Sequence, residues 1–153
     1  MIAADTTTLT ALCLIGRLDL VRRLFGKVAI SPTTDEELRK ILRALDPDCE
    51  PPSPDVVEVV AVDISAPAMS LGESETLELC RRVTASHLLT DDPVVRAEAQ
   101  KQGTNCIGTL GVLHAARARG IIQDVEEALA RLRQVGYAAA PECERVLLDR
   151  STG

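Results

Sequence analysis

Aromatic residues are nearly absent from this chain of 153 residues. Phe25 and Tyr137 are its only aromatic side chains, there is no tryptophan, and 46% of the residues are hydrophobic. The core must therefore be built from Leu, Val, Ile and Ala. A chain with so few aromatic rings also lacks the base-stacking platform that many single-strand-binding proteins use.

Basic residues are fewer than acidic residues, so the formal net charge is −6 and the isoelectric point lies near 4.9. This balance argues against a broad phosphate-binding surface, although it leaves room for a local basic patch. Basic side chains on two predicted helical regions are candidates for such a patch, and an ordinary solvated helix face explains each of them equally well. The candidates are Arg17, Arg22, Arg23, Arg39, Lys40 and Arg43.

Long apolar runs and paired cysteines are missing too. No segment reaches the roughly 18 uninterrupted apolar residues that a membrane span needs. The first stretch, "MIAADTTTLTALCLIGRLDLVRR", carries Asp5 among its apolar residues and lacks the basic start of a secretory signal. The five cysteines are scattered, without a CxxC pair that would indicate zinc or a redox motif. We therefore expect a reduced, cytoplasmic chain with no membrane span.

The hydrophobic pattern alternates short β-like runs with longer helical segments, which predicts an α/β fold with a parallel sheet covered by helices. The first strand is the weakest prediction, because Ala is a poor strand former. Strands are expected at 1–4, 27–30, 56–62, 87–89 and 105–108. Helices are expected at 7–16, 18–26, 33–45, 73–83, 93–103, 109–120, 121–136 and 141–150.

Chain length favours a single domain, because 153 residues is the size of one ordinary domain. The proline-rich stretch 46–55 is too short to separate two domains and is expected to be a loop. Near the C-terminus, one helical face carries four apolar residues, so the last helices should pack on the sheet or form a dimer contact. These residues are Ile122, Val125, Leu129 and Leu132.

Acidic residues recur where predicted strands end. Asp5 follows the first strand, Glu37 lies one turn into the helix after the second, and Glu75 opens the helix before the fourth. Asp91 and Asp92, in "HLLTDDPVVR", directly follow the fourth strand. The carboxyl ends of parallel strands are the usual ligand-binding edge of such a sheet. We therefore expect the side chains to converge there.

A cluster of carboxylates is unfavourable unless a cation fills it. Hard divalent ions such as Mg²⁺ and Mn²⁺ prefer oxygen ligands, and Mg²⁺ often shares phosphate oxygens with its substrate. A cation bound there would activate water as a nucleophile and stabilise charge on a phosphate. The predicted cluster therefore indicates phosphoryl chemistry.

Helix capping offers a structural alternative for each acid. Thr34 followed by Glu37 reads as a capping box, and Asp92 before a proline reads as an N-cap. Asp5 can likewise cap the helix that follows it. Glu73 and Glu75 lie in the first turn of the helix predicted from residue 73, where negative charge suits the helix dipole. No capping rule explains why all the acids should gather at one edge.

Other candidate sites are weaker. His87 and His114 have no cysteine or carboxylate at a ligand spacing, which favours structural roles. Gly108 and Gly111, in "IGTLGVL", do not form a phosphate-binding fingerprint. They predict tight packing between a strand and a helix.

Four blocks of the sequence resemble PIN-domain proteins, most closely the VapC-like subgroup. They are "IAADTTTLTALCLIGRLDLVRRLFGKVAISPTTDEEL", "LGESETLELC", "LLTDDP" and "NCIGTLGVLHAARARGII". The blocks occur in the family's order with suitable spacings, and the resemblance covers roughly residues 2–137.

The resemblance implies a PIN-like three-layer fold, with a central, mostly parallel sheet flanked by helices. The single domain 1–153 would comprise a core of about 2–137 and a helical extension of about 138–150. The implied activity is that of a ribonuclease dependent on Mg²⁺ or Mn²⁺, the toxin of a type II toxin–antitoxin pair. RNA would be its substrate, a cognate antitoxin its protein partner, and a homodimer its expected form.

Carried over by position, the resemblance implies specific roles for the acids. Asp5, Glu37, Glu75 and Asp92 would be catalytic, and Asp91 would join Asp5, Glu75 and Asp92 in holding metal. Thr7 would orient Asp5 or a water molecule. We expect Asp92 to face Asp5 and Glu75, with Asp91 nearer the rim, where it would hold a second metal or its water.

The sequence also departs from the family pattern. Ser74 replaces a glycine before the third acid, Leu77 replaces a glutamate, Pro93 replaces an arginine after the acid pair, and Thr34 replaces an apolar residue. None of these changes removes a metal-binding acid, but loss of the arginine could weaken substrate binding.

Two alternatives belong to other functional classes. One is a PIN-fold binding or regulatory protein with little or no nuclease activity. The other is a flavodoxin-like receiver domain, which would need an acid pair after the first strand, where this chain has only Asp5. RNA cleavage that needs metal and is lost in Asp5→Asn would separate these alternatives.

Overall fold

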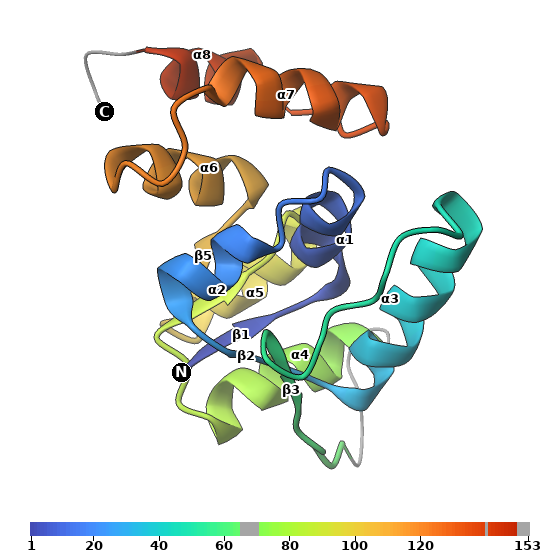
Figure 1. Ribbon diagram of the computed structural model, residues 1–153. Helices are drawn as coiled ribbons and strands as arrows, with labels where there is room; N and C mark the ends of the chain where they lie inside the picture. Colours follow the sequence, from blue (N-terminus) through green and yellow to red (C-terminus); the bar gives the residue numbers. More distant parts are fainter. Residues whose placement is uncertain (65–70, 140, 150–153) are drawn as a thin grey trace.

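The computed structural model describes residues 1–64, 71–139 and 141–149, and a five-stranded parallel sheet lies at its centre (Figure 1). All five expected strands are confirmed. They are β1 (Ile2–Ala4), β2 (Val28–Ile30), β3 (Val57–Val59), β4 (His87–Leu89) and β5 (Asn105–Ile107). The strand order is β3-β2-β1-β4-β5, so β1 lies in the middle, between β2 and β4.

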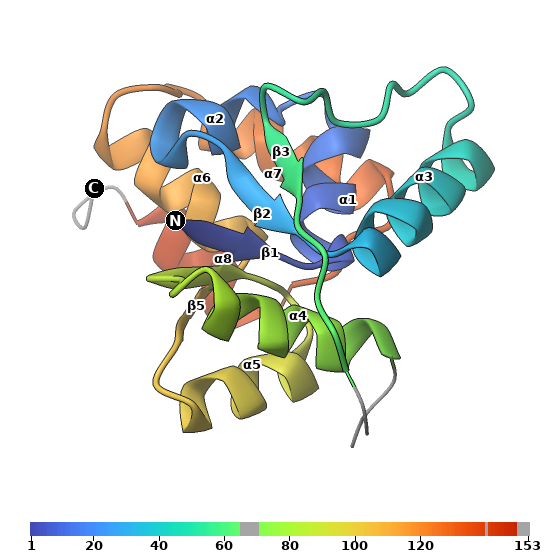
Figure 2. The ribbon, with the colours of Figure 1, turned by 90° about the horizontal axis from the view of Figure 1, so that it is seen from below.

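The expected helices are confirmed as well, and they cover both faces of the sheet. Helices α4 and α5 lie on one face, and α1, α2 and α6 lie on the other (Figures 1 and 2). Helix α3 packs against both α1 and α4. The helices are α1 (Thr6–Leu14), α2 (Asp19–Phe25), α3 (Pro32–Leu45), α4 (Leu71–Arg82), α5 (Pro93–Lys101), α6 (Thr109–Ala118), α7 (Val125–Gln134) and α8 (Pro141–Leu148).

Two hydrophobic cores lie on opposite sides of the sheet, because successive strand residues point to opposite faces. Ala3 and Ala29 belong to the smaller core under α4 and α5, together with Leu88. Ile2 and Ile30 belong to the larger core, which the remaining helices complete. The small alanine side chains of β1 therefore suit close helix packing on both faces of the sheet. Because alanine is a poor strand former, the same residues made β1 the weakest strand prediction.

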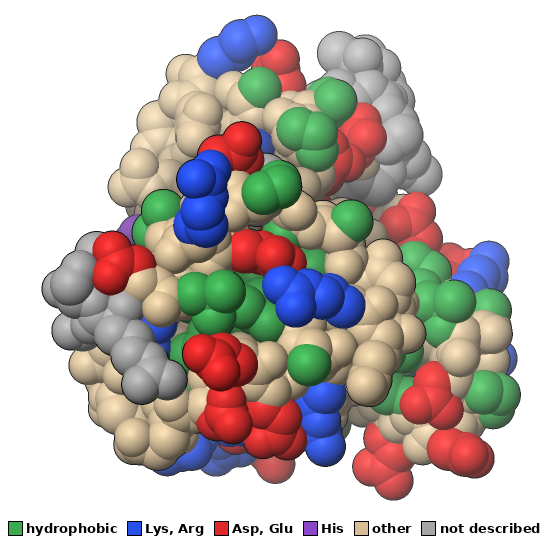
Figure 3. Space-filling model, turned by 90° about the horizontal axis from the view of Figure 1, so that it is seen from above, with side chains coloured by type: hydrophobic (Ala, Val, Ile, Leu, Met, Phe, Trp, Pro, Cys, Tyr) green, Lys and Arg blue, Asp and Glu red, His purple; other side chains and the backbone are tan. Residues whose placement is uncertain are grey.

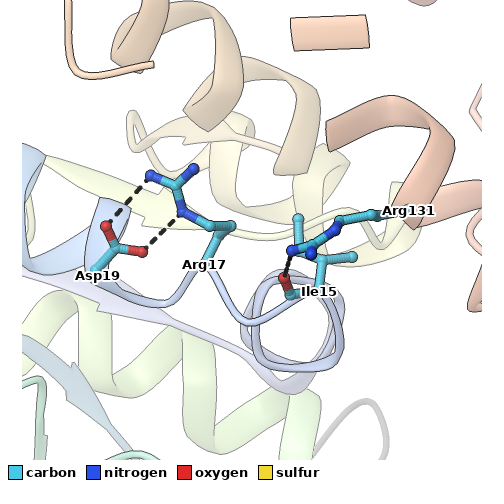
Figure 4. Close-up of polar contacts among 4 residues, drawn as sticks. All are labelled: Ile15, Arg17, Asp19 and Arg131. Carbon is cyan, nitrogen blue, oxygen red and sulfur yellow. Dashed lines mark hydrogen bonds and ion pairs between the residues drawn. The ribbon is translucent and has the colours of Figure 1, made fainter. Parts of the chain in front are cut away.

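The C-terminal helices pack on α6. Helices α6, α7 and α8 contact one another, and α7 and α8 lie on the side of α6 away from the sheet (Figure 1). The predicted apolar face from Ile122 to Leu132 is buried. The Arg131 guanidinium donates to the Ile15 carbonyl at 3.1 Å, which joins α7 to the end of α1 (Figure 4). Arg117 of α6 donates to the Leu147 carbonyl in α8.

No helix in the described ranges has the length and apolar character that crossing a membrane requires.

The start of α3 differs from the expected capping box. Helix α3 begins at Pro32, and its N-cap is Ser31, whose hydroxyl accepts from the Thr34 amide at 3.1 Å. Thr34 is thus inside the first turn, and Glu37 lies further along the helix on an exposed position. The capping-box interpretation was wrong because a serine followed by proline already supplies a cap and a preset first helical residue.

This assignment predicts different effects of two substitutions. Ser31→Ala should lower the free energy of unfolding by about 0.5–2 kcal/mol, since a buried cap is lost. Glu37→Ala should change it by less than about 0.5 kcal/mol, because the side chain is exposed. Urea denaturation of both variants provides the measurement, and a larger loss in Glu37→Ala would reinstate the capping box.

Candidate active site

The carboxyl ends of β1 and β4 form the point where the connections of the sheet change face. Helix α1 leaves β1 toward one face, and α5 leaves β4 toward the opposite face (Figures 1 and 2). Open parallel sheets bind ligands at such a switch point. Asp5 directly follows β1, and Asp91 and Asp92 follow β4 after Thr90.

Asp5 is a buried carboxylate held on both of its oxygens. It is the N-cap of α1, and its Oδ1 accepts from the Thr7 amide at 2.9 Å and from the Thr7 hydroxyl at 2.6 Å. Its Oδ2 accepts from the Thr90 hydroxyl. The expectation that Asp5 caps a helix and that Thr7 orients it is therefore confirmed. Only 7% of Asp5 is exposed.

Burial raises the pKa of Asp5 above its ordinary value, because it disfavours the charged carboxylate. The hydrogen bonds from Thr7 and Thr90 act in the opposite direction, and the negative charge of Asp91 adds to the increase. The raised pKa shows that burial outweighs the donors. Burial therefore makes the charged form of Asp5 less favourable than it is in water.

Two threonine hydroxyls link Asp5 to the backbone of the acid pair. The Thr7 hydroxyl accepts from the Asp91 amide at 2.8 Å while it donates to Asp5. The Thr90 hydroxyl accepts from the Asp92 amide at 3.1 Å while it also donates to Asp5. The positions of Asp5 and of the acid pair are therefore interdependent.

The Asp91 side chain accepts four hydrogen bonds. Its Oδ1 accepts from the Thr109 amide at 2.9 Å and from the Tyr137 hydroxyl at 3.1 Å. Its Oδ2 accepts from the hydroxyls of Thr109 at 2.5 Å and Thr8 at 3.2 Å. These donors come from α1, α6 and the segment after α7. Asp91 is thus part of an internal network, which differs from the expected place at the rim.

Asp92 is the N-cap of α5, as expected. Its Oδ1 accepts from the amides of Val94 at 2.8 Å and Val95 at 3.3 Å. Among the described residues, both hydrogen bonds that its carboxylate accepts involve Oδ1, so Oδ2 is the oxygen that remains for another ligand.

Glu75 and Glu37 do not complete a preformed cluster. Glu75 is half-buried in α4, and its buried Oε2 has no hydrogen-bond partner within the described part of the chain. Glu37 is exposed on α3. Across residues 1–64, 71–139 and 141–149, no three acidic, histidine or cysteine side chains form a group that could hold a metal. The expected convergence on a common point is therefore not observed.

Arg96 and Gly108 pack around the acid pair. The Arg96 guanidinium, one turn into α5, donates to the Thr90 carbonyl at 3.1 Å. A Cβ at Gly108 would lie 2.6 Å from Asp91 Oδ1 and 3.0 Å from Arg96 Nη2, and a Cβ at Gly111 would lie 2.9 Å from a methyl carbon of Ile107. The prediction that both glycines serve tight packing is confirmed, and Gly108 makes room for the Asp91 carboxylate.

Most of the candidate phosphate-binding residues have neighbouring partners. The Arg17 guanidinium pairs with Asp19 at 3.0 Å (Figure 4). Acidic and basic side chains are interspersed on the face in Figure 3, without a continuous basic patch. A solvated surface with local ion pairs is therefore the better interpretation. The other pairs are Arg22–Asp55, Arg39–Asp35 and Lys40–Glu36.

A cleft of about 690 Å³ adjoins Asp91 between β5, α6 and α8. Arg96, His114 and Tyr137 supply polar lining, whereas Ile107 and Val146 are among its apolar residues. Because Asp91 lines the cleft, a small molecule there can approach the internal network.

Sequence reasoning missed four side chains of this network: Thr8, Thr90, Thr109 and Tyr137. Thr90 and Thr109 did carry a signal, because each stands next to a predicted strand end and beside a candidate acid or a tight glycine turn. Tyr137 carried none, since it lies 46 residues from Asp91 in the chain.

Comparison with known proteins adds a family and a fold. A family model described as a PIN domain matches residues 1–152. The chain is also similar to the structure of a PilT N-terminus domain protein from the hyperthermophilic archaeon Sulfolobus solfataricus P2. The two share 20% identity with a TM-score of 0.50 over 92% of this chain and 100% of that chain, a likeness that concerns the fold alone. No curated protein matches this chain.

The raised pKa of Asp5 predicts a pH-dependent difference between wild type and Asp5→Asn. When the pKa of a carboxyl group is raised in the folded state, the folded protein loses stability as pH rises. The loss begins near the pKa of the group in the unfolded chain, about 3.9, and continues through its pKa in the folded protein. The difference in unfolding free energy should therefore shift in favour of Asp5→Asn as pH rises from about 4 toward neutrality.

Urea denaturation in chelator across this range measures the shift. The control is Thr10→Val, which removes a buried hydroxyl that has no hydrogen-bond partner among the described residues. Because no ionisable group is changed, this variant should follow the wild-type profile. A constant difference between Asp5→Asn and wild type would show that Asp5 is not perturbed by burial.

Proposed function

The chain belongs to the PIN-domain family, whose model matches nearly all of it, and from this premise we propose that it is a metal-dependent endoribonuclease. PIN domains are generally nucleases that use divalent metal ions. The main support from this chain is the buried Asp5 carboxylate, which is fixed at the switch point of the sheet although its charge is unfavourable there. A cation would compensate that charge.

The donor set fits Mg²⁺ or Mn²⁺, because the candidate ligands are all carboxylate oxygens. Glu75 Oε2 is buried without a hydrogen bond in the described residues, and Asp92 has one oxygen beyond its capping bonds. The described side chains do not form a closed cage. This arrangement suits Mg²⁺, which usually keeps several waters and binds one or two carboxylates together with substrate phosphates.

Asp5, Glu75 and Asp92 are the residues that would hold the cation. When bound, such a cation lowers the pKa of water and stabilises negative charge on the phosphate. Thr7 and Thr90 keep the Asp5 carboxylate in one orientation. Arg96 places a positive charge beside the end of β4, where Pro93 occupies the position in which the family often has arginine.

RNA is the proposed substrate, and its phosphodiester bond is the proposed site of hydrolysis. Since the chain is acidic and its surface arginines are largely paired, affinity would depend mainly on contacts close to the cation. The resemblance to VapC-like proteins supports a role as the toxin of a toxin–antitoxin pair in the cytoplasm, as a homodimer neutralised by a cognate antitoxin.

A PIN-fold binding protein without nuclease activity is the second candidate. The observation that favours it is the lack of three converging acids in the described residues. Such a protein would bind RNA or a partner without consuming it, so cleavage itself separates the two functions.

We predict cleavage of RNA by the purified chain in Mg²⁺ or Mn²⁺ and none in chelator. Asp5→Asn and Asp92→Asn should each lower the rate by roughly 100-fold or more, because the lost charge contributes several kcal/mol through the cation. Melting temperature should change little in Asp92→Asn, since Asn caps a helix about as well as Asp. Gel assays and thermal melts measure both quantities.

Glu98→Gln is the matched control, because it makes the same chemical change on α5 in a side chain paired with Lys101. It should cleave at the wild-type rate. Equal activity in wild type and Asp5→Asn would point to a contaminating nuclease and reject the proposed site, whereas RNA binding without cleavage would favour the second candidate.

A further inference from the structure

The hydrogen-bonding capacity of Asp91 is fully used within the protein. An ionised carboxylate offers about four lone-pair positions, and four donors occupy them: the Thr109 amide and the hydroxyls of Thr109, Thr8 and Tyr137. A cation could bind Asp91 only by displacing at least one of these donors.

The other acids at this edge differ from Asp91. Asp92 uses one oxygen for the cap of α5, and Glu75 Oε2 has no hydrogen bond among the described residues. These two side chains keep acceptor positions that Asp91 lacks. The adjacent aspartates are therefore suited to different tasks.

Resting on the proposed function, we propose that Asp91 is a positioning residue and not a cation ligand, and that Tyr137 anchors it from the segment between α7 and α8. Asp91 would hold the backbone of residues 91–92, and through it the ligands Asp5 and Asp92.

The hydrogen bonds define how this positioning reaches Asp5. The amides of Asp91 and Asp92 donate to the hydroxyls of Thr7 and Thr90, and both hydroxyls donate to Asp5. A shift of the Asp91 side chain would move these amides and loosen both supports of Asp5. Asp91 thus acts through the backbone that follows β4.

Tyr137 is contributed to this network by the segment between α7 and α8. It follows α7, which the Arg131 bond to the Ile15 carbonyl holds against α1. Burial raises the pKa of Tyr137, and the charge of Asp91 and their hydrogen bond raise it further. The phenol is therefore a protonated donor at neutral pH. Because Tyr137 is half-buried, its hydroxyl can be removed without opening a core.

Tyr137→Phe gives a test with opposite outcomes. If Asp91 positions the site, kcat should fall roughly tenfold, as expected for loss of one hydrogen bond to a charged group, while KM for RNA stays within about twofold. If Asp91 were a ligand, removing one of the two donors to its Oδ1 would leave kcat unchanged or strengthen Mg²⁺ binding, and that result would overturn the proposal. Thr10→Val is the hydroxyl-deletion control.

Calorimetry of Mg²⁺ binding without RNA separates the acids. Asp91→Asn should weaken Mg²⁺ binding clearly less than Asp5→Asn does, because it removes a group that positions the ligands and not a ligand itself. An equal loss in the two variants would overturn the inference while leaving the proposed function intact. Absence of Mg²⁺ binding by folded wild type would instead count against the proposed function, and this inference would fall with it.

The single tyrosine supplies a spectroscopic readout. With one Tyr and no Trp in the chain, ultraviolet absorption near 280 nm reports Tyr137 almost alone. Asp91→Asn should shift this band, because the acceptor loses its charge. Saturating Mg²⁺ should leave the wild-type band unchanged, and a Mg²⁺-induced shift matching that of Asp91→Asn would show that the cation takes Asp91 from Tyr137.

Discussion

The carboxylate of Asp5 is the constraint around which this molecule is arranged. It lies at the end of the central strand, is almost completely buried, and has a pKa raised by that burial. Such a group destabilises the folded protein unless donors or a cation compensate it. The donors come from Thr7 in the helix that Asp5 caps and from Thr90 directly after the neighbouring strand β4, so the pairing of β1 with β4 is needed to hold it.

The threonines have a second function, because each accepts an amide from the acid pair while it donates to Asp5. A hydroxyl can donate and accept at once, and threonine supplies it from a stiff, β-branched side chain. Alanine or valine at Thr7 or Thr90 would remove one donor from Asp5 and deprive an amide of the acid pair of its acceptor. Ionised Asp5 and the turn after β4 are therefore stabilised by the same bonds.

Much of the fold was predictable because its signals are local. Hydrophobic periodicity, turn residues and capping residues predicted the five strands and the helices. Asp5 and Asp92 cap the helices that follow them. Ser31 was missed although its serine–proline signal was present, since the pattern from Thr34 to Glu37 was favoured instead. The contacts of Asp91 with Thr109 and Tyr137 span 18 and 46 residues. No local rule reports such contacts, and neither strand order nor the exposure of Glu37 could be read from sequence period.

Capping and ligand binding were treated as alternatives for the acids, but the structure makes them compatible. An N-cap uses one carboxylate oxygen and fixes the side chain at the positive end of a helix dipole, where negative charge is favoured. In Asp92 the cap occupies Oδ1, which restrains the direction of Oδ2 without using it. A free carboxylate would lose rotational freedom on binding a cation, whereas a capping carboxylate has already lost it when the protein folds. A strand can therefore be followed by two acids because Asp92 caps a helix and Asp91 joins a buried hydrogen-bond network. Neither role requires the two carboxylates to be in contact.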